Sequence, residues 1–220
     1  MTARLSFEHE LQVLRDNLDE MGQLIEAAIE KTLVAFETQN EVLASEIITG
    51  DRNINDIEKI IESRCLSLIL KQQPVARDLR IVTTALKVVT DMERIGDHAA
   101  DIAELILREK REQIYNLVKH IPEMGKVAKE MVHDSVHAFT TLDVDAARTT
   151  MKKDDVVDDL FDRVKDEVAS ILRTSNEQVD QCVDILMIAK YFERIGDHAV
   201  NICEWTEFHE TGSVNNIRIL

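Results

Sequence analysis

A seven-residue segment occurs twice in this chain: residues 93–99 and 193–199 both read ERIGDHA. When the comparison is extended to residues 104 and 204, the two segments agree at nine of twelve positions. Each copy lies in a stretch whose apolar residues recur every three or four positions, which is the period of an amphipathic helix. The chain is therefore predicted to consist of two similar helical units in tandem.

The composition favours long helices over strands. The 220 residues include 2 Pro, 6 Gly and 4% aromatic residues, against 45% hydrophobic and 31% charged residues, which is typical of helices joined by few turns. We expect Pro74 to open the third helix, Pro122 to lie near the start of the fourth, and one further helix to follow residues 142–145. The prediction is an all-α protein of six long helices in two three-helix bundles, residues 1–112 and 113–220.

Charge and cysteine usage exclude several classes of function. A net charge of -16 argues against binding to duplex nucleic acid or to an anionic membrane surface, because both need a concentrated basic face. The 3 cysteines form no C-x-x-C pair, so neither a disulfide framework nor a thiolate zinc site is indicated, and we expect them to be buried. No stretch approaches the roughly 18 apolar residues of a membrane-spanning helix. We expect a soluble, cytoplasmic protein.

Acidic side chains form a stripe on the helix that carries each repeated segment. At 100° per residue, Glu93, Asp97 and Asp101 fall within about 80° of one another, opposite the apolar side of the helix. Glu193 and Asp197 repeat the pattern. Like charges at i and i+4 destabilise a helix by a few tenths of a kcal/mol per pair, so a bound cation would turn this repulsion into attraction.

One helix offers too few oxygen ligands for a divalent cation, which needs several from converging elements. The preceding helix of each half carries a second pair with the same spacing, Asp51 with Asn55 and Asp154 with Asp158. If that helix runs antiparallel to the next, each pair can face the acidic stripe of its own half. The sequence thus predicts two oxygen-rich metal sites, one per half.

Other interpretations of these residues stay open. A charged stripe opposite an apolar seam is most often a solvated helix face. Gly96 costs about 1 kcal/mol of helix propensity relative to Ala, which suggests that a neighbouring helix or a ligand approaches closely. Arg94 and Arg194 can either neutralise the acids or present a donor to a partner or an anion. His98 and His198 are expected to flank the stripe rather than to act as ligands.

These motifs resemble those of the PhoU family of bacterial phosphate-uptake and phosphate-signalling regulators over essentially the whole chain. The two ERIGDH copies are similar to the repeated E(D)-x-x-x-D metal motifs of the family, and the pairs on the preceding helices match its companion motifs. Residues 73–80, QPVARDLR, are similar to its Q-P-x-x-x-D-L-R segment. Four motifs in the same order and spacing make the resemblance specific.

The resemblance implies two three-helix bundles related by a pseudo-twofold axis, with multinuclear iron or zinc clusters on the acidic motifs. It also implies a negative regulator that links the phosphate-specific ABC transporter to a sensor histidine kinase and silences phosphate-starvation genes when phosphate is plentiful. Asn55 and Asn201 stand where an acid is expected, which lowers the negative charge of each site and puts full clusters in question.

The sequence therefore predicts a non-catalytic adaptor that is a homodimer, binds the transporter ATPase subunit and the kinase, and neither binds nucleic acid nor inserts into a membrane. A metal-dependent hydrolase of phosphate esters, acting at the carboxylate clusters, is the alternative, and a helical interaction module with solvated acids is a third reading. Arg94 and Arg194 are candidate contacts for a partner or an anion. The candidate metal ligands are Asp51, Asn55, Glu93, Asp97, Asp101, Asp154, Asp158, Glu193, Asp197 and Asn201.

Overall fold

The computed structural model describes residues 3–108, 118–174, 178–214 and 217–218. The first half forms α1 (Ala3–Thr38), α2 (Glu41–Gln72) and α3 (Arg77–Leu107). The second half forms α4 (Ile121–Thr141), a short α5 (Val144–Met151), α6 (Asp154–Thr174) and α7 (Val179–Thr211), followed by the two-residue strands β1 (Ser213–Val214) and β2 (Ile217–Arg218), which pair antiparallel. The predicted all-α class with six long helices is confirmed, and α5 is an addition to it.

The expected helix after residues 142–145 is divided into α5 and α6. The Asp143 side chain caps α5 by accepting a hydrogen bond from the backbone N–H of Ala146. The chain then turns at Lys153, whose N–H donates to the carbonyl of Thr150 at 2.9 Å and whose Nζ lies 2.8 Å from Oδ2 of Asp134 on α4. Because this pairing is a contact between distant segments, helical periodicity alone did not reveal the break.

The expectation that Pro74 opens the third helix is wrong. Gln73 ends α2 in the left-handed conformation, with φ 47°, and its N–H donates to the carbonyl of Ile69. Ala76 also has a positive φ, 49°, immediately before α3 begins at Arg77. Two left-handed residues reverse the chain here, so Pro74 lies within the turn. Pro122, by contrast, lies in the first turn of α4, as expected.

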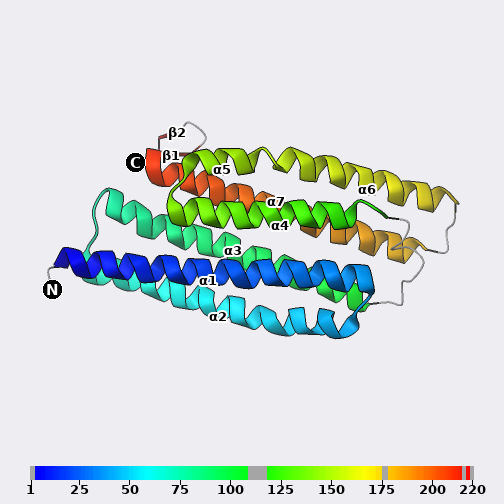
Figure 1. Ribbon diagram of the computed structural model, residues 1–220, viewed down its shortest axis with the longest axis horizontal. Coiled ribbons are helices and arrows are strands. Elements are labelled where there is room, and N and C mark those ends of the chain that lie inside the picture. The colour runs from blue at the N-terminus through cyan, green and yellow to red at the C-terminus, as the bar shows by residue number, and fades with distance from the viewer. Residues whose placement is uncertain (1–2, 109–117, 175–177, 215–216, 219–220) are drawn as a thin grey trace.

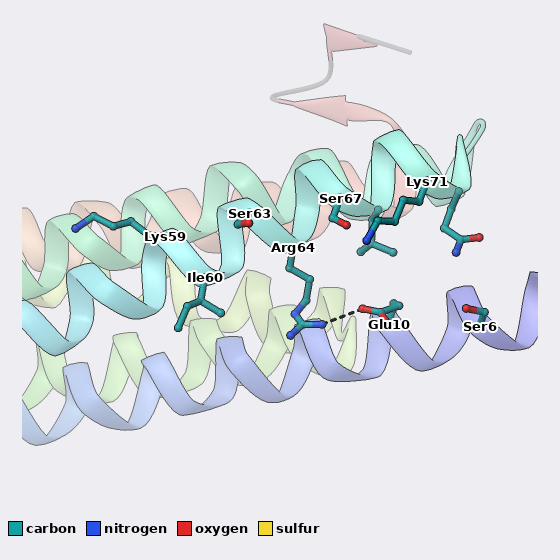
Figure 2. A pocket seen from close by; sticks show the side chains of 10 residues that line it. Ser6, Glu10, Lys59, Ile60, Ser63, Arg64, Ser67 and Lys71 are labelled. Carbon is teal, nitrogen blue, oxygen red and sulfur yellow. Dashed lines mark hydrogen bonds and ion pairs between the residues drawn. The ribbon is translucent and has the colours of Figure 1, made fainter.

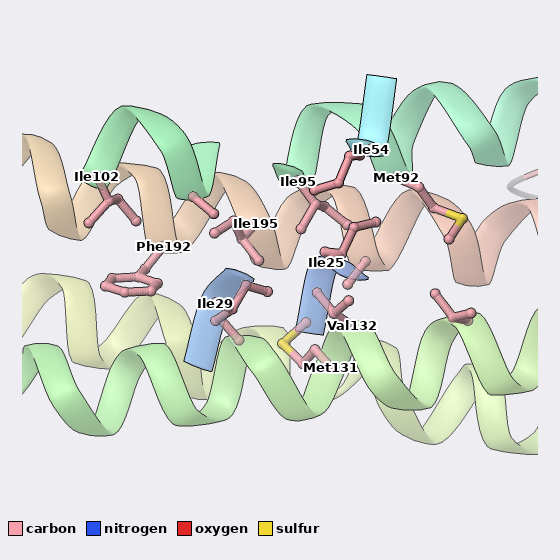
Figure 3. Packing of buried hydrophobic residues seen from close by; sticks show 14 of the residues in the cluster. Ile25, Ile29, Ile54, Met92, Ile95, Ile102, Met131, Val132, Phe192 and Ile195 are labelled. Carbon is pink, nitrogen blue, oxygen red and sulfur yellow. The ribbon is translucent and has the colours of Figure 1, made fainter. Parts of the chain in front are cut away.

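The long helices lie side by side along the long axis of the molecule, with α3 and α7 in contact between the two repeats and α1 against α4 (Figure 1). One continuous cluster of buried apolar residues draws on both repeats. Figure 3 shows Ile25, Ile95, Met131 and Ile195 converging from α1, α3, α4 and α7. The predicted boundary between residues 112 and 113 lies outside the described residues, so the division into two domains stays a prediction.

The repeat is visible in the packing of α2 and α6, whose residues correspond with an offset of 103 positions. Buried residues of α2 match buried residues of α6 at this offset, namely Ile54 with Val157, Ile61 with Val164, Cys65 with Val168 and Leu68 with Ile171. The same offset relates Asp51 to Asp154 and Asn55 to Asp158. Corresponding helices therefore present corresponding faces to the core.

The cysteines behave as the sequence predicts. Cys65, Cys182 and Cys203 are all free and buried. Burial raises the pKa of the Cys65 and Cys203 thiols to about 12, so they stay protonated at neutral pH and act as small apolar side chains. None of the helices in the described part of the chain is long and apolar enough to cross a membrane.

Candidate metal centres and the junction between them

The first acidic site consists of Asp51 and Asn55 on α2 with Glu93 and Asp97 on α3. Gly96 brings the two helices together. A Cβ atom at Gly96 would lie 2.9 Å from Cδ1 of Ile54 and 3.5 Å from Oδ1 of Asp51. The absence of a side chain at Gly96 therefore lets α2 pack close to α3, and this packing places the α2 pair opposite the α3 acids as the sequence predicted.

The carboxylates of the first acidic site repel one another in a partly buried setting. Burial raises the pKa of Asp51, and the negative charge of Asp97 raises it further, while a hydrogen bond from Asn55 Nδ2 to Asp51 Oδ2 at 2.9 Å opposes the rise. The pKa of Glu93 is also raised, first by burial and then by Asp97. Protonation or a cation would relieve this repulsion.

Glu58 on α2 belongs to the same group and was missed by the sequence analysis. Burial raises its pKa, with further contributions from Glu62 and Asp97. Glu58 lies seven residues after Asp51, which is two helical turns along the same face. That spacing could have identified Glu58 from the sequence. The corresponding position in the second repeat is Phe161, so this extra acid is particular to the first half.

The second acidic site consists of Asp154 and Asp158 on α6 with Glu193 and Asp197 on α7. A Cβ atom at Gly196 would lie 3.3 Å from Oδ1 of Asp154, so this glycine also marks the closest approach of the two helices. Burial and the neighbouring carboxylates, Asp158 first, raise the pKa of Asp154 to about 6. The pKa of Asp158 is raised by burial and then by Glu193.

Basic side chains neutralise part of the charge in both sites. Arg94 Nη1 lies 3.0 Å from Asp97 Oδ2, and its Nε lies 3.5 Å from Glu93 Oε2. In the second site, Arg194 Nη1 lies 3.5 Å from Asp197 Oδ2, and Lys190 forms an ion pair with Glu193. In this structure the two arginines therefore neutralise the acids, which is the first of the two roles considered for them.

Two further predicted ligands lie toward the other repeat. Asn201 donates from Nδ2 to Oδ1 of Asp91 at 3.0 Å, across the interface between α7 and α3. Asp101 lies between the first acidic site and the junction, because its charge adds to the effects of burial and Asp97 on the pKa of Asp51, while its Oδ2 lies 3.5 Å from Nδ1 of His98. Periodicity gave the angle of Asn201 around α7, but the neighbour on that side is the other repeat rather than α6.

Histidines fill the junction between the two sites. The rings of His98 and His198 have centroids 5.5 Å apart, and the Nδ1–H of His198 donates to Asp91 Oδ1 at 2.8 Å. Burial is the main cause that lowers the pKa of His98. As expected, these histidines flank the acidic stripes. Asp91 was not singled out from the sequence, because nothing in the helical pattern shows that it faces α7.

The donor set fits an oxygen-preferring cation in its chemistry. Oδ1 of Asp51 and Oδ1 of Asn55 are buried and accept no hydrogen bond from any described residue, so each holds a lone pair free for a ligand bond. Carboxylate and amide oxygens suit hard or borderline divalent ions. Within the described ranges, however, no group of three or more His, Cys, Asp or Glu side chains is already gathered around a common point.

Comparison with known proteins gives one consistent result. The family model described as "PhoU domain" matches residues 18–106 and 121–206, one match per repeat. The phosphate-specific transport system accessory protein PhoU homolog of Clostridium acetobutylicum is 41% identical over 213 residues, which are 96% of this chain and 97% of that protein. The PhoU protein of Escherichia coli is 31% identical over 206 residues, 94% and 86% of the two chains.

Solved structures agree with this assignment. The crystal structure of the phosphate transport system regulatory protein PhoU from Streptococcus pneumoniae superposes with a TM-score of 0.88 at 30% identity, over 96% of this chain and 100% of that one. PhoU from Pseudomonas aeruginosa gives a TM-score of 0.86 at 29% identity. Because the family pattern covers both repeats and the relatives span nearly the whole chain, this protein belongs to the PhoU family.

Proposed function

We propose that this protein is a negative regulator of phosphate uptake and of the phosphate-starvation regulon. It acts as a non-catalytic adaptor between the ATPase subunit of a phosphate ABC transporter and a sensor histidine kinase. The observation that carries the proposal is the similarity over 96% of the chain to a protein named a phosphate-specific transport system accessory protein. The adaptor works in the cytoplasm, where both partners present their soluble domains.

The shape of the molecule supports an adaptor. Its long helices share one core, so the faces of the two repeats keep a fixed relation to each other. The two acidic sites open on helix pairs of different repeats, α2 with α3 and α6 with α7. A rigid body with two related faces can hold two partners at once, and the effective concentration of one partner near the other then rises without any new contact.

Metal ions belong to the proposal as structural cofactors of the acidic sites. We propose that iron or zinc binds to Asp51, Asn55, Glu93 and Asp97 in the first acidic site, and to their counterparts Asp154, Asp158, Glu193 and Asp197 in the second. Burial is the main cause of the raised pKa values of Asp51 and Asp154, and the metal would cancel the repulsion between carboxylates that raises them further. It would also present a positive centre on an otherwise acidic face, to which an acidic group of a partner could bind.

The deciding experiment is genetic. In a strain that lacks the gene, cells grown with ample phosphate should express their phosphate-starvation genes, measured as alkaline phosphatase activity or by a reporter. The plasmid-borne gene should restore repression. Normal repression in the deletion strain would overturn the adaptor proposal. Purified, metal-loaded protein assayed against a panel of phosphate esters tests the hydrolase alternative, because turnover that disappears in Glu93→Gln would establish catalysis instead.

A further inference from the structure

A groove of about 620 Å³ lies between the N-terminal part of α1 and the C-terminal part of α2, and at Lys59 it adjoins Glu58 of the first acidic site. Figure 2 shows Arg64 reaching from α2 across the groove to Glu10 on α1. Three basic side chains line it, Lys59, Arg64 and Lys71, with Glu10 as the acidic member of the lining. The lining therefore carries two net positive charges on a chain whose total charge is -16.

The basic residues follow a ridge that winds around α2 by about 40° at each step, so that the directions of Lys59 and Lys71 differ by about 120°. Lys59, Ser63, Ser67 and Lys71 succeed one another every four residues, which places their side chains on one ridge of the helix. Twelve residues separate the two lysines, a distance of about 18 Å at 1.5 Å per residue. An extended peptide needs about six steps of about 3.3 Å to cover this axial rise and the turn around the helix, and residues six steps apart point to the same side. One small anion can therefore meet only one of the two lysines.

The polar groups of this ridge are available for a ligand. Among the described residues, neither the hydroxyl groups of Ser63 and Ser67 nor the ammonium group of Lys71 makes a hydrogen bond or ion pair. Lys59 has an exposed partner, Asp56, at 3.7 Å, and its charge also opposes the rise that burial causes in the pKa of Glu58. Exposed pairs of this kind contribute little in water. Arg64 is held in place, with Nη1 2.8 Å from Glu10 Oε2 and Nε 3.2 Å from Asn17 Oδ1.

The second repeat shows that packing does not require these basic residues. At the offset of 103 that aligns the buried faces of α2 and α6, Lys59 corresponds to Asp162 and Arg64 corresponds to Glu167. Glu167 accepts hydrogen bonds from the backbone N–H of Lys119 and pairs with His120. The same helix position thus packs equally well with the opposite charge, and the basic groove is a property of the first repeat alone.

We propose that this groove binds an extended acidic segment, about seven residues long, of a partner protein. Two acidic side chains of the segment meet Lys59 and Lys71, while its backbone bonds to the serine hydroxyls between them. A short segment fits better than an extended anionic surface such as a nucleic acid, because the acidic remainder of the protein repels anything wider than the groove. The inference deepens the proposed adaptor function, on which it rests, by giving the chemistry of one partner.

Fluorescence anisotropy at low ionic strength tests the proposal with two labelled heptapeptides of identical composition. In Glu-Ser-Leu-Ser-Leu-Ser-Glu, the acids point to the same side and are spaced to meet both lysines, whereas in Glu-Glu-Ser-Leu-Ser-Leu-Ser they are adjacent. We expect the spaced peptide to bind at least about tenfold more tightly. The double variant Lys59→Glu/Lys71→Glu should weaken its binding at least about tenfold, since two contacts become repulsive.

The matched control is Lys87→Glu/Lys152→Glu, which changes the net charge equally at two exposed lysines outside the groove. Its Kd should stay within about threefold of the wild-type value, and circular dichroism should show all three proteins equally helical. If both double variants lose the same amount of affinity for the spaced peptide, the effect comes from net charge alone and the proposal is overturned. Equal affinity for the two peptides would overturn it as well.

Two further outcomes would assign the groove to another ligand. Displacement of the peptide by inorganic phosphate at a lower concentration than by unlabelled peptide would indicate a site for small anions. Self-association in sedimentation velocity that is lost in Lys59→Glu/Lys71→Glu would indicate that a second copy of the chain occupies the groove. The deletion strain tests the adaptor function separately, so loss of the groove proposal would leave derepression in that strain unchanged.

Discussion

His198 and Asp91 join the two repeats, with Nδ1 of the histidine on α7 2.8 Å from Oδ1 of the aspartate on α3. Both side chains are largely buried, at 11% and 14% exposure. Asp91 lies two residues before Glu93 of the first acidic site, and His198 directly follows Asp197 of the second. The bond therefore links the backbones that carry the two sites.

This pair should contribute measurably to stability. We expect a double-mutant cycle of Asp91→Ala and His198→Ala, measured by urea denaturation, to give a coupling energy of about 1–3 kcal/mol. The reason is that each single substitution leaves the remaining buried side chain without its hydrogen-bond partner. The exposed pair Lys59 and Asp56 provides the comparison and should couple by less than about 1 kcal/mol. Equal coupling energies for the two pairs would contradict the structural role of the junction.

The closeness of α2 and α3 predicts opposite effects of alanine at two helical glycines. Gly96→Ala should lower the free energy of unfolding by about 1–3 kcal/mol, because its Cβ would lie 2.9 Å from Ile54 Cδ1. Gly50→Ala should raise it by about 0.5–1 kcal/mol, since nothing lies within 4 Å of a Cβ there and alanine favours the helix. Chemical denaturation measures both. A stabilised Gly96→Ala protein would show that the helices are less tightly packed than described.

Asp154 should make the protein less stable as the pH rises through the range in which this side chain ionises. Its pKa is raised from 3.8 to about 6 in the folded state, so the folded protein binds the proton more tightly than the unfolded chain. The stabilisation from this proton is present below pH 3.8 and is lost between pH 3.8 and pH 6.

Asp154→Asn should therefore raise the free energy of unfolding at pH 7 by about 1 kcal/mol, a figure reduced for the exposure of the group to solvent. Its stability should also vary less between pH 4 and pH 7 than that of the wild-type protein. The exposed neighbour Asp159 supplies the control, Asp159→Asn. If both variants follow the wild-type pH profile, the carboxylates of the second acidic site do not repel one another as described.

Metal binding should raise the thermal unfolding temperature, and the rise should grow with the logarithm of the affinity of the folded state for the metal. Protein purified without chelator should contain iron, zinc or a similar ion by elemental analysis. Asp51→Asn/Asp97→Asn and Asp154→Asn/Asp197→Asn should each lose part of that metal and part of the rise in unfolding temperature. Glu41→Gln, an exposed acid at the start of α2, should lose neither. Equal metal content in all variants would place the metal outside the acidic sites.

Helical periodicity was sufficient to predict the features that depend on one helix and its nearest partner. The apolar spacing predicted the long helices, and the equal spacing of Asp51 with Asn55 and of Glu93 with Asp97 predicted that the two pairs face each other. Gly96 was expected to mark a close approach, and Ile54 lies against it. These predictions succeed because the side-chain direction around a helix is fixed by residue number.

The features that sequence did not predict depend on contacts between distant segments. The break before α6 involves an ion pair from Lys153 to Asp134 on another helix. Asn201 bonds to Asp91 in the other repeat, although its angle around α7 suggested a place in the acidic stripe. Nothing in a one-dimensional pattern shows which neighbour covers each side of a helix, so these assignments required the structure.

The apolar core that the two repeats share bears on whether one repeat is stable without the other. A fragment of residues 1–112 would keep its three helices but would leave bare the sides of α1 and α3 that α4 and α7 now cover, among them the surroundings of Ile25 and Ile95. Uncovered apolar surface of that kind drives aggregation. Although the pattern of residues is modular, we therefore expect neither half to survive alone as a soluble monomer.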